Sequence, residues 1–585
     1  MRKILTIICF VLLAVPSFGA DSVYYMAATA VGDEDCTSEA NACVIATINA
    51  AWATMRTQLA SNDVRVKIKR GDTITLTAGW QLLGSTPTNL TYRFYLEDYG
   101  TGDKPKIRRS GGTQLLQLDE NSNVTLQNLD IAFTGTPSQG SRGLDIQDND
   151  NGGMGGIHVI SCDFSNIDFY SLALHGLGNY NIIANNTFTD VGNAIYFIEG
   201  ASNPGDYNYV GGNTFLRINW NDAFRDTTDG HAISFRNSDY NVIENNTATY
   251  CRLPYDIYVT AGNDATYTVI RNNTATYSER PGIDLYSEDF SGDVGSHYAW
   301  VYQNTLVDSG YDDGIGPRPQ IRVNAFAGTG GVHIMHNTLY NNTAGEWGVE
   351  GRDGVDYRKV MNNIIRSNGI GADDDLIYFD PSGETVGANN ETNYNLYWAT
   401  SDPSAQTLWT HTDGVAKTWA QWQALGWDAN SDVADPNFVD TTDFELDTGS
   451  PAIDTGTWFA TISDVDESGT SFDVGSGEGK WFHGRFGTMV DEDGTAVNGT
   501  PITLSNGQTA TVTAVSGDTI TVSSSVTWTD GVTKVGIGTI YGTAPDIGAN
   551  EYESAAPTNA IQGVSISNLN ITDNLTAWNR SDGLR

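Results

Sequence analysis

One short phrase recurs seven times along the chain, most often as Tyr-x-x-Val/Ile-x-x-Asn-Thr. The copies read YNIIANNTF, YNYVGGNTF, YNVIENNTA, YTVIRNNTA, YAWVYQNTL, GVHIMHNTL and YRKVMNNII. Their aligned asparagines are Asn186, Asn213, Asn246, Asn273, Asn304, Asn337 and Asn363. Subtracting successive positions gives spacings of 27, 33, 27, 31, 33 and 26 residues. A conserved phrase at a loose period indicates one short supersecondary unit repeated with loops of variable length.

A second short strand lies between successive phrases. Its copies read AIYF, AISF, DIYV, GIDLY, QIRV, WGVE and LIYF. Both strands alternate apolar and polar residues, and Gly, Asn and Asp separate them. A unit of this size cannot bury its apolar face alone, but stacked copies can. The pattern therefore predicts an all-β solenoid whose parallel strands lie roughly 4.8 Å apart from coil to coil.

The asparagine column has an architectural explanation. An inward Asn at a tight bend satisfies backbone groups of the turn, and stacked Asn side chains hydrogen-bond from coil to coil. Cys162 and Leu129 occupy the equivalent places in the preceding coils. We interpret the column as a structural ladder and not as a functional site.

The repeated phrases resemble the right-handed parallel β-helix repeats of the pectate-lyase-like superfamily. The segments WQALGWDANSDVADPNFVD, FELDTGSPAIDTG and PDIGANEYE resemble a C-terminal signature of secreted bacterial β-helix proteins. The resemblance implies a right-handed parallel β-helix, but that fold hosts lyases, hydrolases, epimerases and adhesins. It also implies that substrates lie on the sheet that follows each long loop, here the AIYF-type strands.

The chain ends and the segments between them divide into five regions. Residues 1–20 read as a signal peptide, with a basic start, an apolar run too short to span a bilayer, and a small-residue exit. Residues 21–63 form the expected N-terminal cap, in which 42–59 read as an amphipathic helix with Asn41 as N-cap. The β-helix is expected over 64–456, and a C-terminal region with an inserted β module over 457–552. The pattern does not place the tail, residues 553–585.

Four cysteines remain after the signal peptide, and their spacing indicates which of them can form a disulfide. Cys36 and Cys43 flank a short loop and are expected to form a disulfide. Cys162 and Cys251 lie about three coils apart, about 14 Å at the strand spacing, which is too far for a bridge. We expect a secreted monomer, extracellular or periplasmic, with no membrane span.

The charge balance limits the partners. Removal of residues 1–20 leaves 31 − 2 = 29 basic and 71 acidic residues, a net charge of 29 − 71 = −42. This excess argues against nucleic acid and anionic membranes as partners. It allows Ca²⁺ as a cofactor, although acidic loops are also common as solvated surface. The candidate Ca²⁺ ligands are Asp226, Asp229, Asp464 and Asp466.

The alternation predicts two outward columns on the AIYF-type strands. The first reads Asp145, Ala173, Tyr196, Ser234, Tyr258, Asp284, Arg322, Gly348 and Tyr378. The second reads Gln147, His175, Ile198, Arg236, Thr260, Tyr286, Asn324, Glu350 and Asp380. The candidate catalytic residues on this face are Arg236, Tyr258, Asp284, Tyr286, Arg322 and His175. The candidate substrate-binding residues are Tyr196, Asn324, Glu350 and Arg318.

This mixture of residues suits an acidic sugar chain. Arg pairs with a carboxylate, and Tyr stacks on a sugar face and can transfer a proton. In β-elimination of a uronide, Arg or Ca²⁺ neutralises the carboxylate, a base removes the C5 proton, and an acid protonates the leaving oxygen. Arg236 or Arg322 fits the first role, and Tyr258, Tyr286 or His175 the proton transfer. The structural alternative, without a catalytic role, is that Asp284 and Arg322 form a cross-strand ion pair.

Two family motifs are incomplete. The segment from Asp226 to Gly230 resembles the start of the polygalacturonase motif, but its Asp-Asp pair and Gly-His-Gly are absent. No Lys matches the motif of the alginate lyase and chondroitinase B family. Because the outward face carries Arg and Tyr and the hydrolase motif is incomplete, we expect a polysaccharide lyase acting on an acidic polysaccharide. Without that Lys, its chemistry would rely on Tyr, His or Arg. The alternatives are a non-catalytic glycan-binding adhesin, and a glycoside hydrolase that uses Asp226, Asp229 and Asp284.

Overall fold

The computed structural model describes residues 21–83, 92–119, 122–147, 155–175, 179–198, 205–219, 230–260, 265–287, 297–310, 318–324, 331–340, 347–352, 358–367, 375–379, 390–399, 406–410, 414–465 and 468–553. The coil, its cap and the C-terminal module belong to one unit that ends at Tyr552. Residues 1–20, Asp226, Asp229, Asp466 and the tail after Glu553 lie outside the described residues, so the predictions on them stay predictions.

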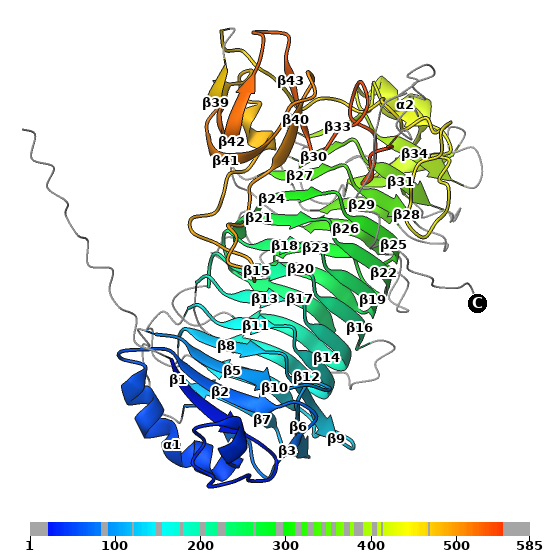
Figure 1. Ribbon diagram of the computed structural model, residues 1–585. Coiled ribbons are helices and arrows are strands. Elements are labelled where there is room, and N and C mark those ends of the chain that lie inside the picture. Colours follow the sequence, from blue (N-terminus) through cyan, green and yellow to red (C-terminus); the bar gives the residue numbers. More distant parts are fainter. Residues whose placement is uncertain are drawn as a thin grey trace, which may run out of the picture. The chain divides into compact units, whose positions relative to one another are not determined.

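The chain winds into a parallel β-helix with three strand columns (Figure 1). Sheet A holds the strands that precede the asparagine bend. They are β1 (Ser22–Met26), β2 (Val64–Lys69), β5 (Phe94–Tyr99), β8 (Val124–Gln127), β11 (His158–Ile160), β13 (Ile182–Ala184), β15 (Tyr209–Gly211), β18 (Val242–Glu244), β21 (Ala265–Arg271), β24 (His297–Tyr302), β27 (Val332–Met335), β30 (Arg358–Met361) and β33 (Glu391–Asn393).

Sheet B follows the bend. Its strands are β3 (Thr73–Leu76), β6 (Lys106–Ser110), β9 (Asp130–Thr134), the first halves of β12 (Asp163–His175) and β14 (Thr187–Ile198), β16 (Thr214–Ile218), β19 (Thr247–Cys251), β22 (Thr274–Ser278), β25 (Thr305–Ser309), β28 (Thr338–Tyr340), β31 (Ile364–Ser367), β34 (Leu396–Ala399) and β37 (Asp432–Val433).

Sheet C carries the predicted site. Its strands are β4 (Trp80–Gln81), β7 (Gln114–Asp119), β10 (Arg142–Gln147), the second halves of β12 and β14, β17 (His231–Arg236), β20 (Leu253–Val259), β23 (Ile283–Ser287), β26 (Pro319–Asn324), β29 (Trp347–Arg352), β32 (Ile377–Phe379) and β35 (Thr407–Thr410). The strand β36 (Ala416–Thr418) pairs antiparallel with β35. The prediction of a right-handed parallel β-helix is confirmed.

The asparagine ladder exists and is longer than the sequence phrase suggested. Each buried Asn accepts hydrogen bonds from the backbone and side-chain amides of the preceding one, as in Asn246 to Asn273, both at 3.0 Å. The residue before each ladder Asn has a left-handed backbone, for example Asn272 at φ 54°. Asn395 continues the ladder and donates to Asp428 at 3.2 Å. Its phrase has Thr392 in place of Val or Ile, so it does not match the repeated sequence phrase.

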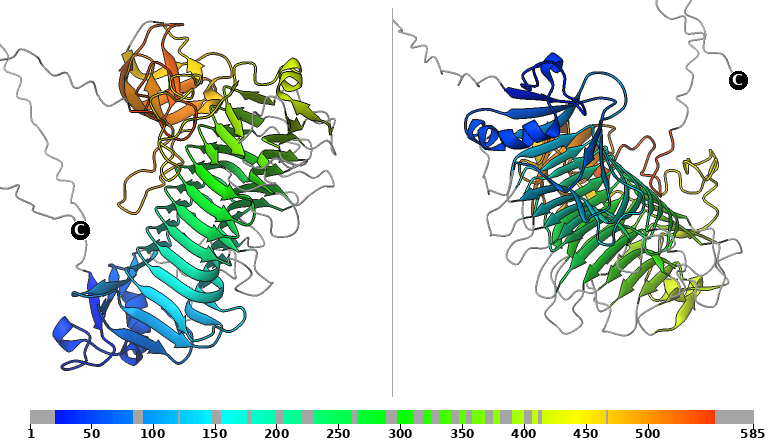
Figure 2. Two further views of the ribbon diagram at one scale, coloured as in Figure 1. Left: turned by 90° about the vertical axis from the view of Figure 1, so that its right-hand side faces the viewer. Right: turned by 90° about the horizontal axis from the view of Figure 1, so that it is seen from below.

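A helix covers the N-terminal end of the coil (Figure 2). Helix α1 (Ile45–Gln58) buries Ile48, Trp52 and Met55 against the core. The prediction that it begins at residue 42 with Asn41 as N-cap is wrong, because the helix starts at Ile45. The Cys36–Cys43 disulfide forms as predicted. The backbone of Cys43 hydrogen-bonds Tyr25 of β1 and Ala27 just after it, which keeps the chain extended up to Cys43. Cys162 and Cys251 are free and buried, as the coil spacing predicted.

The C-terminal β module lies against the outer face of sheet A (Figures 1 and 2). It is an antiparallel sheet in the order β38 (Ala460–Thr461), β43 (Lys534–Ile537), β40 (Pro501–Leu504), β41 (Thr509–Ser516), β42 (Thr519–Thr527) and β39 (Ser468–Asp473). Before it, helix α2 (Trp419–Ala424) has a capping box between Thr418 and Gln421. Short 3₁₀ turns span Glu39–Asn41 and Gly479–Trp481. No helix among the described residues is long and apolar enough to cross a membrane.

Buried Arg271 fixes the module to the coil. Its guanidinium pairs with Glu244 at 2.6 Å and donates to the Tyr302 hydroxyl at 2.9 Å. It also donates to the carbonyls of Asn498 and Gly499, both at 3.2 Å. One cluster of buried apolar residues joins sheet A to the module, with Val269 on one side and Val512 on the other. The module is thus packed on the coil as part of the fold.

Candidate functional site

The strand register of sheet C decides which outward side chains are neighbours. Paired positions run Asp145, Ala173, Tyr196, Ser234, Asp256, Asp284, Arg322, Glu350 and Tyr378. The predicted register is therefore wrong by two residues at two coils, because Asp256 replaces Tyr258 and Glu350 replaces Gly348. The first error arises because the sequence pattern aligns Ile257 with Ile233, whereas buried Tyr255 holds that inward place. The second arises because Val349, and not Trp347, pairs with Ile321. A shift of two residues leaves each side chain on the same face of the strand. The prediction that these columns point outward is therefore unaffected by the register error.

The second outward column brings Arg236, Tyr258 and Tyr286 together on strands β17, β20 and β23. The rings of Tyr258 and Tyr286 stack with their centroids 5.4 Å apart. All three side chains are half-buried. Sequence reasoning placed Tyr258 in the first column, so this contact was not predicted.

Arg236 is a cation held by aromatic rings. Its guanidinium carbon lies 4.4 Å from the Tyr258 centroid and 5.2 Å from that of Tyr196. Burial acts to lower the pKa of Arg236, but its electrostatic interactions with Tyr196 and Asp256 outweigh that effect and raise it. Within the described part of the chain, Arg236 forms no ion pair with a carboxylate. In a protein with 71 acidic and 31 basic residues, such a cation is notable.

Asp284 and Arg322 form the cross-strand ion pair that was the alternative interpretation of these two residues. Nε of Arg322 donates to Oδ1 of Asp284 at 2.8 Å, and a second nitrogen of the guanidinium donates to Oδ2. Burial acts to lower the pKa of Arg322, but the charge of Asp284 and these hydrogen bonds raise it. Arg322 also lies over the Tyr286 ring, 5.2 Å from its centroid.

Asp256 is a site residue that the sequence reasoning missed. It is 2% exposed, accepts a hydrogen bond from the Ser234 hydroxyl at 2.8 Å, and lies 3.1 Å from Nδ1 of His231. Its register partner on the next strand is Asp284. The sequence signal for Asp256 is the Asp of PYDIYV, in the place where a polygalacturonase would have an Asp-Asp pair.

The remaining substrate-binding candidates lie at the C-terminal end of this face. Glu350 and Asn324 are buried, at 0% and 2% exposure, and Arg318 is half-buried. Tyr378 of the first outward column, which was not a candidate, is also half-buried. Tyr378 stacks on Trp347 with centroids 4.3 Å apart. Glu350 pairs in register with Arg322, so it belongs to the column of Asp284 and not to that of Asn324.

His175 lies apart from the Arg322 end of the face. It is on β12, five strand steps before β26, or about 24 Å at the usual strand spacing. Its Nε2 lies 3.2 Å from Oδ1 of Asp145, which also accepts from Arg142 at 3.0 Å. Burial acts to raise the pKa of Asp145, but the hydrogen bond from His175 and the charge of Arg142 lower it. His175 therefore belongs to a separate polar group from Tyr286 and Arg322.

Of the candidate Ca²⁺ ligands, only Asp464 is described. Its carboxylate accepts a hydrogen bond from the backbone N–H of Val465 at 2.9 Å. The described residues hold no group of three or more His, Cys, Asp or Glu that could bind a metal ion. The Ca²⁺ prediction stays untested, because its other ligands lie elsewhere in the chain.

A family model supports the fold of the coil. Residues 114–306 match the family model described as a right handed beta helix region. Similar solved structures include pectate lyase Pel9A, at 14% identity and a TM-score of 0.38 over 92% of this chain and 98% of that chain. An α-1,3-glucanase catalytic unit from Streptomyces thermodiastaticus has 14% identity and a TM-score of 0.46 over 70% of this chain and 69% of its own.

An alginate lyase from Paenibacillus sp. has 13% identity and a TM-score of 0.28 over 58% of this chain and 96% of its own. No curated protein matches this sequence. At these identities and scores the likenesses say nothing of the reaction or substrate of this chain. The family-model match and the strand pairing together make it a right-handed parallel β-helix protein, the fold that the resemblance to the pectate-lyase-like superfamily implied.

Proposed function

We propose that this chain is a secreted carbohydrate-active protein that binds an acidic polysaccharide on sheet C and cleaves it by β-elimination. The observation that supports the proposal most is Arg236. It is a cation with no carboxylate partner in the described residues, held between aromatic rings on the outward face. A guanidinium in this state is suited to a uronate carboxylate, and the adjacent rings are suited to the sugar face.

The proposed reaction divides the work between neighbouring side chains. Arg236 binds the uronate carboxylate and withdraws charge from C5. Tyr258 takes the C5 proton as a phenolate, whose formation the adjacent Arg236 cation favours. The C5–H electrons form the C4=C5 double bond, and the C4–O bond breaks. Tyr286, stacked on Tyr258, protonates the leaving oxygen. The Asp284–Arg322 pair positions Tyr286 through the contact of Arg322 with its ring.

A glycoside hydrolase is the second candidate, because Asp256 and Asp284 are paired on adjacent strands. Hydrolysis needs two carboxyl groups about 5–9.5 Å apart on either side of the scissile bond. Both carboxylates are only 2% exposed. That of Asp256 contacts His231 and Ser234, and that of Asp284 contacts Arg322. Arg236, Tyr258 and Tyr286 are more accessible, which favours elimination over hydrolysis.

The test is product analysis. The protein is incubated with polygalacturonate and with alginate, with and without Ca²⁺, and both ultraviolet absorbance of unsaturated ends and release of reducing ends are followed. Unsaturated ends support the proposal. Reducing ends without ultraviolet absorbance indicate the hydrolase. Retained binding without either product indicates a glycan-binding adhesin, and absence of both binding and product on any uronate polymer rejects the assignment to acidic polysaccharides.

A further inference from the structure

A column of tyrosines runs along the outer edge of sheet A, away from the site on sheet C. The rings of Tyr180, Tyr207, Tyr240 and Tyr267 stack with centroid distances of 5.1, 4.7 and 4.8 Å. These tyrosines are the first residues of the repeated phrase, and each has a left-handed backbone conformation. The repeat that builds the ladder inside the coil therefore builds an aromatic column outside it.

The parallel stacking ends at the fifth ring of this column. Tyr298 is tilted by 50° to Tyr267, and it meets Trp300 edge to face with centroids 4.7 Å apart. Tyr267 is 40% exposed.

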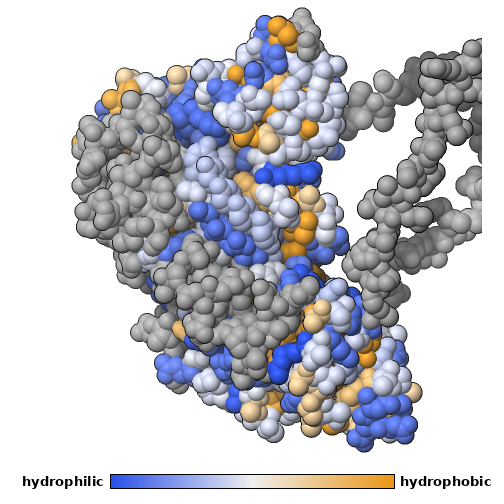
Figure 3. Space-filling model, turned by 90° about the vertical axis from the view of Figure 1, so that its left-hand side faces the viewer, coloured by the Kyte–Doolittle hydropathy of each residue, from blue (hydrophilic) through white to orange (hydrophobic). Residues whose placement is uncertain are grey.

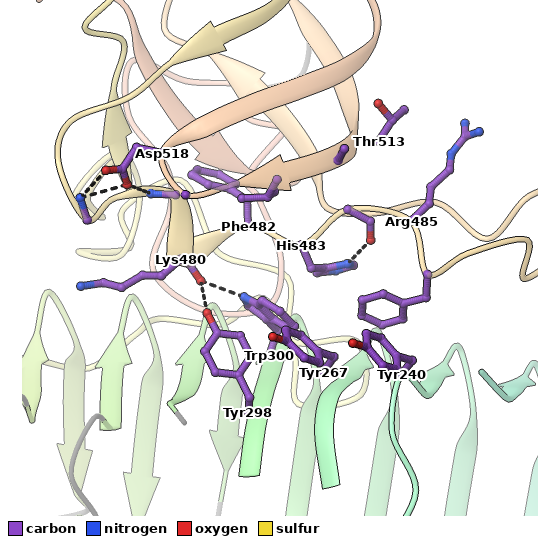
Figure 4. A pocket seen from close by; sticks show the side chains of 17 residues that line it. Tyr240, Tyr267, Tyr298, Trp300, Lys480, Phe482, His483, Arg485, Thr513 and Asp518 are labelled. Atoms are coloured by element: carbon purple, nitrogen blue, oxygen red, sulfur yellow. Dashed lines mark hydrogen bonds between the residues drawn. The ribbon is translucent and has the colours of Figure 1, made fainter. Parts of the chain in front are cut away.

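A cavity of about 710 Å³ lies at this break, between sheet A and the C-terminal module. Figure 4 shows Tyr240, Tyr267, Tyr298 and Trp300 rising from the sheet A side toward the module. Phe482 and Phe486 of the module line the opposite wall. A cavity of this volume, with aromatic walls and several polar groups, is typical of a small-ligand site.

The polar groups of the cavity are held in place. Tyr298 and Trp300 both donate to the carbonyl of Lys480, at 3.4 and 3.1 Å. Asp518 accepts the backbone N–H groups of Gly477 and Gly479, at 2.9 and 3.1 Å, so its carboxylate is already occupied. Burial and the nearby Tyr267 raise the pKa of Tyr298 to about 12, so its hydroxyl stays protonated.

Two cations, Lys480 and Arg485, lie at opposite ends of the lining residues (Figure 4). Neither forms an ion pair within the residues that the structure describes, although Arg485 donates to Asn498 at 3.3 Å. Desolvation and the charge of Lys359 lower the pKa of Lys480, a cost that an anionic ligand would reduce. The surrounding surface is mostly hydrophilic, with hydrophobic residues in small groups (Figure 3).

We infer that this cavity is a second saccharide-binding site, which takes an anionic sugar chain. The aromatic walls contact the sugar face, the tyrosine hydroxyls match its hydroxyl groups, and Lys480 and Arg485, at opposite ends of the cavity, pair with carboxylates of different sugar residues. The site is non-catalytic, since the residues assigned to elimination lie on sheet C. It would hold a chain beside the coil while sheet C acts on another part of it or on another chain.

The experiment uses the full chain with Arg236→Ala, which removes the proposed uronate contact on sheet C. Digalacturonate and the neutral galactobiose are titrated into this variant by isothermal calorimetry. The inference predicts one bound digalacturonate and binding of galactobiose at least about tenfold weaker, as loss of charge-assisted hydrogen bonds implies. Adding Lys480→Ala and Arg485→Ala weakens digalacturonate binding by at least about tenfold, and Tyr267→Ala weakens both sugars.

The matched control is Lys534→Ala, an exposed lysine of the same module that does not line the cavity. It leaves binding unchanged. Absence of binding in the Arg236→Ala background, equal affinity for the neutral sugar, or insensitivity to the Lys480 and Arg485 changes overturns the inference. If the proposed lyase function is wrong, the wild-type protein forms no unsaturated product. That result is independent of the sugar binding measured in this titration.

Discussion

Asp256 and Asp284 lie opposite each other on strands β20 and β23, and each carboxylate is satisfied by a different set of partners. Asp256 has Ser234 and His231, and Asp284 has Arg322. Two like charges on adjacent strands repel each other, so these separate partners are what makes the arrangement tolerable. Stability at this point of the coil therefore depends on Arg322.

We predict that Arg322→Leu lowers the free energy of unfolding by about 3–5 kcal/mol, because it leaves Asp284 buried without its cation. The double variant Asp284→Leu, Arg322→Leu recovers a large part of that loss, since it removes both charges. Thermal unfolding followed by circular dichroism measures both. A single variant as stable as wild type, or a double variant less stable than the single one, contradicts this account.

The interior of the ladder can be tested at Asn273. Its side chain accepts from the backbone and side-chain amides of Asn246 and donates to Ile243, at 2.9–3.0 Å. Asn273→Ala leaves these buried groups unpaired, at about 1–3 kcal/mol for each group. The control is exposed Asn272→Gly, which keeps the left-handed conformation at φ 54°. We expect a clear drop in melting temperature for the first variant and almost none for the second.

Glu551 makes the C-terminal end of the described unit sensitive to pH. Burial, and then the charge of Asp546, raise the pKa of Glu551 from 4.5 to about 8. Because the folded pKa is raised, the stabilising contribution is complete below the unfolded value and is lost as the pH rises toward 8. The protection factors of backbone amides around Asp546, which correct for the intrinsic pH dependence of exchange, should therefore fall between pH 5 and pH 8. Glu551→Gln should remove most of that fall, and an unchanged pH dependence of the protection factors in this variant would exclude Glu551 as its source.

The two free thiols report on core integrity. Burial raises the pKa of both Cys162 and Cys251 to about 12, so neither forms a reactive thiolate near neutral pH. Neither residue should react with a thiol reagent in the native protein, and both should react after denaturation. Mass spectrometry of the labelled peptides separates them from other cysteines. Labelling of Cys251 in the native state would show that the coil opens around β19.

The repeated phrase was enough to predict the coil, its ladder and the outward side of each strand. It was not enough for the register, because a shift of two residues preserves the alternation, and only the packing of Tyr255 in place of an Ile settles it. For that reason Asp256 was missed and Tyr258 was placed beside the wrong neighbours. The helix start was misplaced because the disulfide at Cys43 competes with the capping preference of Asn41. The packing of the module on sheet A depends on contacts such as that of Arg271 with Asn498, far apart in sequence, which no local pattern encodes.

The central claim is that Arg236 binds the carboxylate of an acidic polysaccharide for elimination on sheet C. The most direct measurement is the rate of unsaturated product formation by wild type, Arg236→Ala and the matched control Arg366→Ala. Arg366 also lies over an aromatic ring, that of Tyr340 at 4.1 Å, but on sheet B. We predict that Arg236→Ala lowers the rate at least about 100-fold, the loss expected when a charge-assisted contact and its effect on the transition state are removed, while Arg366→Ala retains activity. Equal activity of Arg236→Ala and wild type, with both folded, would contradict the account.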